Sequence, residues 1–492
     1  MRLLTFILSC ATTSCCFASM GSDYSDAALR QLRNATKFQR NGQHILNLSA
    51  LRTLRDKDLR PLFLQFTQHS DWTVQVHAVL GLAELSEEQV VDPWIIQQIS
   101  PPAREHSIAQ ALDDGLMKQD QMEALLEWSL LEENPKLLLI ADLQLLGVEP
   151  KHEMLKGLAN TTDLSVAMFA AILSKDREII DDTTMRLRRA SSSERMKSLL
   201  RTLQLIRQYK TDNSKEWVLS FFENHSLNLT ERERSKLLYT LLTLDKTKGL
   251  ESWNTAFPKS PDRFDQVENL LLLLESGVTP TSKIIERLEI DTSDPLLGPM
   301  VRSGNVTKDQ SLVTNEDIKS LIELVEQGHR KSIEFAFRAA RIRLSNQQAI
   351  SFYKELSALP EDSSPNRKEV TVLAFENLID SDPTSAWEIL SSVKDDSEHQ
   401  ELLLFAALQI SGETATDEAS KLRRIGVNKA DVMTLLLISR GSNPLKEVDL
   451  RNLGRIAAGG GHVSPSFETQ AAWLYLKRMG LTDKALTAVS EN

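Results

Sequence analysis

Four basic side chains on one predicted helix could bind an anionic ligand. They follow Gln327, lie within about 100° of one another on a helical wheel and border an apolar stripe. Arginine can hold a carboxylate through two parallel hydrogen bonds, whereas lysine supplies only a point charge. Glu334 falls in the same arc and neutralises part of the charge. The pattern predicts a partner-binding surface for an acidic protein or an anionic glycan, formed by Arg330, Lys331, Arg338 and Arg341.

A second basic segment covers residues 183–211. Its eight basic residues stand against one acidic residue, which leaves a net charge of +7. On a helical wheel, Lys197 and Arg201 lie opposite Leu199 and Leu203. Charged residues opposite an apolar stripe are typical of a solvated outer face, so we expect this segment to be surface rather than a site.

Motifs for catalysis are missing from the sequence. No G-x-S-x-G elbow occurs, and no two of the nine histidines stand four residues apart as in a zinc-binding helix. His152-Glu153 is a single dyad, which is too few ligands for a metal. The glycine cluster Gly454–Gly461 lacks the Lys and Ser/Thr of a phosphate-binding loop. We therefore expect no enzyme activity, no cofactor and no metal site.

One enzymatic alternative stays open. A cell-wall or carbohydrate-active enzyme, or an accessory factor of one, could hide a catalytic carboxylate pair in a helical array. Acidic pairs such as Asp181-Asp182 and Asp395-Asp396 are common here and nominate no particular site. Buried, clustered carboxylates would identify such an enzyme.

The N-terminus resembles a secretory signal peptide. Arg2 precedes a short apolar run, and Cys16 and Ala18 provide the small side chains that a signal peptidase requires. We expect cleavage after Ala18, which would also remove all three cysteines. The prediction is an exported, periplasmic or extracellular protein. Lipoprotein processing and a structural N-terminal helix in a cytoplasmic protein are the alternatives.

Composition limits the partners of the mature chain. The protein has 492 residues, of which 41% are hydrophobic and 25% charged, so it can form a sizeable core. Its net charge of −11 repels phosphate backbones, which makes nucleic acid an unsuitable partner. No apolar run approaches the roughly 20 residues that a membrane-spanning helix needs.

Helix-start signals follow one another along the chain. Ten of the sixteen prolines come directly after Ser, Thr, Asp or Asn, which is the order of a cap residue and a first helical residue. Ser86 to Gln89 and Thr230 to Glu233 match the capping-box pattern. The fold class is predicted to be all-α.

The predicted helices pair at a loosely fixed period. Loop positions before the second helix of each pair recur every 29 to 38 residues, at Asp71, Pro101, Glu133, Thr162, Ser193, Thr230, Asp262, Ser293, Gln327, Ser364, Asp396, Val427 and Pro465. This spacing predicts a right-handed α-solenoid of about 13 helical hairpins. A set of separate helical bundles is the alternative.

One hairpin resembles a known repeat family. Residues 60–85 carry an Asp in the turn (Asp71), a Val starting the second helix (Val74), and small residues where helices cross, such as Gly81, which is similar to a HEAT repeat. The family has Arg where this chain has Gln75. The last hairpin, near residues 471–486, is as similar to a tetratricopeptide unit. The resemblance implies a binding scaffold and names no ligand.

These observations predict four segments and a function. A signal peptide (1–18) precedes an N-terminal helical-repeat arm (19–290), a loop-rich joint (291–314) and a C-terminal helical-repeat arm (315–492). Proline and glycine crowd the joint and interrupt its apolar periodicity. The function expected from the residues is a non-enzymatic protein–protein interaction scaffold of the bacterial envelope or secreted space.

Overall fold

The described part of the chain is helical throughout. The computed structural model describes residues 24–35, 37, 42–211, 213–225, 229–256, 262–307, 310–358, 367–392, 439, 444–460 and 465–490. Within these ranges every regular element is an α-helix or a short 3-10 helix, and no strand occurs, so the all-α prediction is confirmed there. The predicted signal peptide, its cysteines and the loop markers Ser364, Asp396 and Val427 lie outside the described residues.

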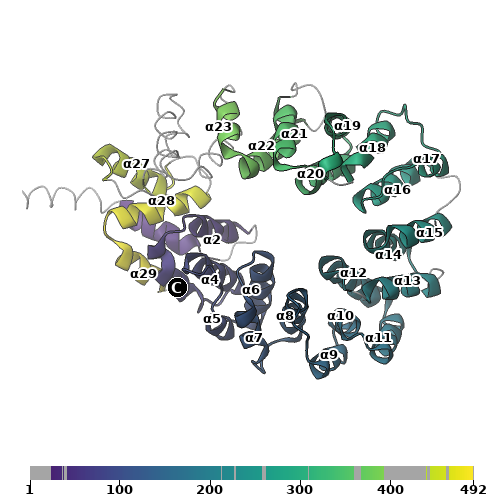
Figure 1. The fold of residues 1–492 in the computed structure, drawn as a ribbon. Helices are drawn as coiled ribbons and strands as arrows, with labels where there is room; N and C mark the ends of the chain where they lie inside the picture. The colour runs from purple at the N-terminus through teal and green to yellow at the C-terminus, as the bar shows by residue number, and fades with distance from the viewer. Residues whose placement is uncertain are drawn as a thin grey trace, which may run out of the picture. The chain divides into compact units, whose positions relative to one another are not determined.

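The chain forms two compact units, whose helices are labelled in Figure 1. The first combines residues 1–139 with residues 387–492. Its elements are a helix over residues 24–35, α2 (Gln43–Thr53), η1 (Lys57–Leu59), α3 (Arg60–Phe66), α4 (Trp72–Leu85), α5 (Pro93–Gln98), α6 (Pro101–Asp113), α7 (Gln119–Leu126), α27 (Glu447–Ala457), α28 (Pro465–Arg478) and α29 (Thr482–Ser490).

The second unit covers residues 140–386. Its elements are α9 (His152–Ala159), α10 (Leu164–Ser174), α11 (Arg177–Arg189), α12 (Ser192–Tyr209), α13 (Ser214–His225), α14 (Glu231–Leu244), α15 (Lys246–Ala256), α16 (Arg263–Glu275), α17 (Ser282–Arg287), α18 (Leu297–Arg302), η3 (Ser303–Thr307), η4 (Gln310–Leu312), α19 (Asn315–Glu326), α20 (Arg330–Arg343), α21 (Asn346–Ser357) and α22 (Arg367–Ser381). Two further helices, α8 (Glu133–Leu145) and α23 (Pro383–Ser392), continue across the unit boundaries in the sequence.

Capping chemistry starts many of these helices. At α5, the Asp92 side chain accepts a hydrogen bond from the backbone N–H of Trp94, and Pro93 occupies the first helical position. At α14, Thr230 and Glu233 form the expected capping box. The proline and capping signals therefore predicted these helix starts correctly.

The capping box expected at Ser86 to Gln89 is wrong. Ser86 ends α4 instead of starting a helix, and its hydroxyl accepts a hydrogen bond from the backbone N–H of Val90. Gln89 has a positive φ of 52°, which a right-handed helix does not allow. The same side-chain types that cap a helix also close a short loop.

In the first unit, the two ends of the chain share one core. Helix α2 packs along α28, and α3 contacts α29. Leu48 and Leu51 of α2 and Trp473 of α28 are completely buried. The rings of Tyr24 and Tyr475 meet edge to face with centroids 6.4 Å apart. Helices from the two ends of the chain thus cover each other's apolar faces.

A polar cluster fixes this contact. The indole N–H of Trp473 donates to Asp56 at 2.9 Å, and the Lys477 ammonium donates to both Asp56 oxygens at 2.7 and 2.8 Å. Burial acts to raise the pKa of Asp56, but these hydrogen bonds outweigh it and hold that pKa below its usual value. Asp56 is therefore a charged anchor between η1 and α28.

In the second unit, successive helices stack along the chain. Helix α10 packs against α9, α11 and α12, and α12 continues onto α14. Every side chain of α10 from Leu164 to Leu173 is buried, which places this helix at the centre of its neighbours. The buried indole of Trp217 on α13 donates to the Thr184 hydroxyl on α11 at 3.0 Å. This buried hydrogen bond thus links α13 to α11.

The glycine- and proline-rich segment 291–314 lies inside the second unit. It contains the six-residue helix α18 and the 3-10 helices η3 and η4. A side chain at Gly298 or Gly304 would collide with Thr292 or Pro280, so both close approaches require glycine. The division of the chain into two arms at this segment stays a prediction.

No described helix is both long enough and apolar enough to cross a membrane.

Candidate binding groove

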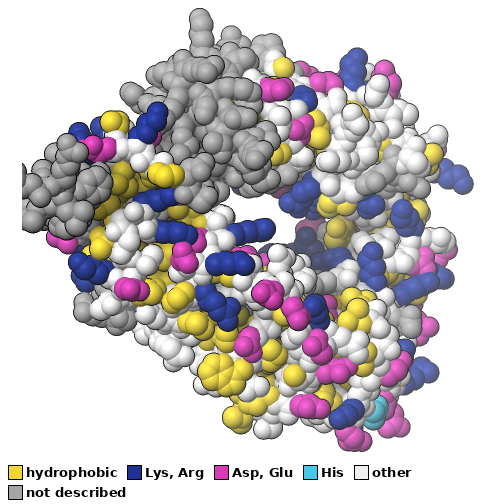
Figure 2. Space-filling view, turned by 60° about the vertical axis from the view of Figure 1, so that its left-hand side comes forward, with side chains coloured by type: hydrophobic (Ala, Val, Ile, Leu, Met, Phe, Trp, Pro, Cys, Tyr) yellow, Lys and Arg dark blue, Asp and Glu magenta, His cyan; other side chains and the backbone are white. Residues whose placement is uncertain are grey.

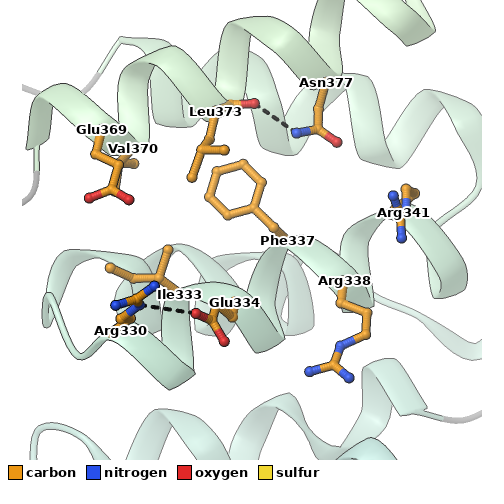
Figure 3. Close-up of a pocket in the computed structure, with 10 residues that line it drawn as sticks. All are labelled: Arg330, Ile333, Glu334, Phe337, Arg338, Arg341, Glu369, Val370, Leu373 and Asn377. Atoms are coloured by element: carbon orange, nitrogen blue, oxygen red, sulfur yellow. Dashed lines mark hydrogen bonds and ion pairs between the residues drawn. The ribbon is translucent and has the colours of Figure 1, made fainter. Parts of the chain in front are cut away.

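Helix α20 places the predicted basic residues beside a groove. Ser332, Ile333, Ala336 and Ala340 form part of its buried face. Phe337 belongs to the apolar stripe and is half-buried: its ring packs against Phe352 and Tyr353 of α21, with centroids 5.8 and 6.1 Å away, and it also lines the groove (Figure 3). The amphipathic pattern predicted the helix but not this aromatic wall.

The groove has a volume of about 690 Å³ and lies between α20 and α22. Some helices that are separated by one other helix in the chain pack closely, namely α4 with α6, α10 with α12, and α12 with α14. By contrast, α20 and α22 contact each other sparsely. Ile333, Phe337, Val370 and Leu373 line the groove with apolar surface (Figure 3). The groove thus lies where α20 and α22 leave a space, whereas the other helix pairs named here are in close contact.

Three of the four predicted cations reach this groove. Arg330, Arg338 and Arg341 line it, together with Glu334 of the same helix. Lys331 does not: its ammonium pairs with Glu268 of α16 and lies 6.0 Å from the centre of an exposed aromatic ring, that of Phe264. The structure therefore gathers the arginines and separates the lysine from them.

The arginines differ in what they already bind. Arg330 pairs with Glu334 at 3.2 Å, one turn along α20. Arg338 pairs with Glu275 of α16 at 2.6 Å. Arg341 is exposed and has no ion-pair partner in the described part of the chain. Arg341 is thus the groove cation that can accept a carboxylate without breaking an existing pair.

Sequence reasoning missed the α22 side of the groove. Glu369 lies at the start of α22 and is exposed, without an ion-pair partner among the described residues. Asn377 donates its amide N–H to the carbonyl of Leu373 at 2.8 Å, which orients its amide oxygen away from the backbone. The spacing of Glu369, Leu373 and Asn377 was the available signal, since residues four apart share one helix face.

The basic segment 183–211 is surface in part and structural in part. Lys197 on α12 is exposed and Arg201 is half-exposed, as predicted. Arg186 donates to the carbonyls of Ala159 and Thr161, while Arg195 pairs with buried Glu233. Some of the basic side chains that give this segment its net charge of +7 are therefore bonded to other parts of the fold.

Candidate catalytic groups have structural roles where the structure describes them. No cluster of three or more His, Cys, Asp or Glu side chains that could hold a metal occurs among the described residues. His77 hydrogen-bonds Arg52 at 3.3 Å, and burial together with the Arg52 charge lowers its pKa to about 4. His152 is half-exposed and lies 3.8 Å from Asp176. The groove is the site with the clearest binding geometry.

On the face shown in Figure 2, side chains of both signs lie interspersed with exposed hydrophobic ones. No family model, curated protein or solved structure matches this chain.

Proposed function

We propose that this protein is an exported, non-enzymatic scaffold for protein–protein interaction. In this proposal it is a HEAT-like, right-handed α-solenoid of about 13 hairpins, the last of them similar to a tetratricopeptide unit. It acts in the bacterial envelope or the secreted space after removal of residues 1–18. The signal-like N-terminus supports export, and N-terminal sequencing of the mature protein tests it.

Polar links between hairpins support the solenoid. Arg52 pairs with Glu84, Arg195 with Glu233 and Arg263 with Asp294, and the members of these pairs stand 32, 38 and 31 residues apart. These separations equal about one hairpin each, as expected when each hairpin stacks on the next.

Gln75 also fits a stacked array. It takes the position where the HEAT pattern has Arg and is buried in α4. Its amide N–H donates to the carbonyl of His69, and its amide oxygen accepts from the backbone N–H of Ser100 at 3.0 Å. A neutral side chain thus links the turn of one hairpin to the first turn of the next.

The observation that carries the binding role is Arg341 beside the apolar groove. Exposed apolar surface and an unpaired guanidinium together suit a segment that contributes both an apolar side chain and a carboxylate. Charge complementarity therefore points to an acidic segment of a protein partner, with its carboxylate on Arg341 and its apolar side chain against Phe337.

The enzyme alternative finds no support in the buried carboxylates. Glu233 is fully buried, but Arg195 and Thr230 hydrogen-bond it. Burial acts to raise the pKa of Glu233, and these bonds outweigh it and lower that pKa. Asp317 closes the capping box of α19 with Thr314. Carboxylates that are hydrogen-bonded in this way stabilise helix ends and do not form a catalytic pair.

The experiment compares two charge reversals on α20. Arg341→Glu removes the groove cation, and Arg343→Glu, two residues later and outside the groove lining, is the matched control. We expect Arg341→Glu to weaken binding of a partner co-purified from native envelope by about 1 to 3 kcal/mol and to reduce its salt dependence. Thermal stability should change by less than about 0.5 kcal/mol.

The control decides how the result is interpreted. The co-purified partner is identified, purified and titrated against all three proteins. Equal affinity for the wild type and the Arg341→Glu variant would refute the groove as the docking site. Equal losses in both variants would instead indicate a non-specific charge effect.

A further inference from the structure

We infer that the groove selects a short extended segment with a basic side chain at one end and an acidic side chain at the other. This inference rests on the proposed function, and it adds the end of the groove opposite Arg341. It replaces a generally acidic partner with a segment whose two ends carry opposite charges.

The two helices that form the groove place unlike charges at its ends. Figure 3 shows Glu369 beside Arg330 and Ile333 at one end, and Arg341 near Asn377 at the other. The chain numbering rises in the same direction along both helices in this view, so α20 and α22 run side by side without reversal. The groove therefore has a defined acidic end and a defined basic end.

Existing ion pairs leave one charge of each sign. Arg330 is satisfied by Glu334, and Arg338 is satisfied by Glu275 outside the groove. Glu369 and Arg341 remain, and neither has an ion-pair partner among the described residues. A uniformly acidic segment would place a carboxylate against Glu369, and such a like-charge contact is unfavourable.

The length of the groove suits a short extended segment. From Arg330 to Arg341, α20 rises by about 16 Å at 1.5 Å per residue. An extended chain covers the same distance with about five residues.

The groove walls provide contacts for the middle of such a segment. Alternate side chains of an extended chain point to one side, so the central side chain of a five-residue segment rests on Ile333, Phe337 and Leu373 when its two end side chains face Glu369 and Arg341. Asn377 also lines the groove, and because its amide nitrogen donates to the carbonyl of Leu373, its amide oxygen is the group left to accept a main-chain N–H of the segment. Apolar contacts hold the segment, and the two end charges select it.

Three capped pentapeptides test this selection on the full-length protein. They are Lys-Leu-Val-Leu-Glu, Glu-Leu-Val-Leu-Glu and Lys-Leu-Val-Leu-Lys, each acetylated, amidated and joined to an uncharged fluorophore. Fluorescence anisotropy at two salt concentrations gives their affinities. We expect the Lys/Glu peptide to bind wild-type protein about threefold tighter than either of the others.

Charge reversal should change the preferred peptide. Glu369→Lys should favour the Glu/Glu peptide, and Arg341→Glu should favour the Lys/Lys peptide. Glu376→Lys on α22 and Arg343→Glu on α20 are the controls outside the groove lining, and both should keep the wild-type order.

The outcomes separate this inference from the proposed function. If wild-type protein binds the Glu/Glu peptide at least as tightly as the Lys/Glu peptide, the two-ended selection is wrong. The proposal of an acidic partner segment is then retained. If the Lys/Glu peptide does not bind, or Glu369→Lys leaves the order unchanged, the two-ended selection is also wrong. The proposed function itself fails only if the native partner binds the Arg341→Glu variant as tightly as it binds the wild type.

Discussion

At the residue scale, neighbours decide which side chains of one type can bind a partner. Lys331 and Arg338 are tied to α16, and Arg330 is tied to its own helix. Arg341 has the same chemistry as Arg338, yet it lies where no described carboxylate reaches it. The helical wheel placed Arg330, Arg338 and Arg341 on one face of α20, and the structure shows them lining one groove, because side-chain direction follows from sequence spacing. It could not assign the ion pairs, which depend on the packing of distant segments.

His77 makes the stability of the protein depend on pH. Its pKa of about 4 lies below the ordinary value of 6.5, because burial and Arg52 oppose its protonation. A group with a lowered folded-state pKa contributes stability above the unfolded pKa and loses it as pH falls towards the folded value. We expect the free energy of unfolding to fall by about 2 kcal/mol because of His77 when the pH is lowered from 7.5 to 5.

Urea unfolding at these two pH values measures this loss. His77→Gln keeps a polar group beside Arg52 without the titration, so the variant should lose about 2 kcal/mol less than the wild type. His106→Gln controls for removal of a histidine at an exposed position. The same pH dependence in His77→Gln and wild type would contradict the assignment.

At the element scale, a short helix explains the position of α20. The Lys331–Glu268 and Arg338–Glu275 pairs each join residues 63 apart, about two hairpins. They connect α20 directly to α16 because α18 between them in sequence has only six residues. The loop-rich composition of 291–314 predicted the irregularity. It could not predict that α16 and α20 would meet, because hydrophobic periodicity gives the face of a helix and not its partner.

Close helix crossing gives a prediction for α14 and α15. A Cβ at Gly249 would lie 2.7 Å from the Cα of Leu242, so Gly249→Ala must push the two helices apart. We expect a loss of about 1 to 3 kcal/mol. The matched control is Gly157→Ala in α9, where nothing lies within 4 Å of the added methyl. That change should stabilise the helix by up to about 1 kcal/mol.

Thermal unfolding of the two glycine variants tests the crossing. The predicted shifts have opposite signs for the same substitution, so a general effect of alanine cannot produce both. Equal melting temperatures for the two variants would show that α14 and α15 do not cross closely at Gly249.

At the scale of the whole molecule, the helical content of the described residues follows from local signals. Cap residues, prolines and apolar spacing act within a few turns, and a sequence shows them directly. The contact between chain ends has no such signal. Trp473 and Asp56 are 417 residues apart, and only folding brings them together. Asp56 gives no hint of this role in the sequence, because an Asp before a short helix is an ordinary cap.

This contact predicts how the protein responds to loss of its C-terminus. An ordinary repeat array frays from a removed end, and the opposite end keeps its structure. Here the removal of residues 459–492 deletes α28 and α29. This deletion exposes Leu48 and Leu51 on α2 and leaves Asp56 without Lys477. We therefore expect hydrogen exchange to accelerate in α2 and in helix 24–35, at the opposite end of the sequence, while α10 to α14 keep their protection. Unchanged protection of α2 in the truncated protein would show that the N-terminal helices are stable without the C-terminal hairpin. The variant Lys477→Gln, which removes one charge and keeps both helices, should give a smaller acceleration confined to the same segments.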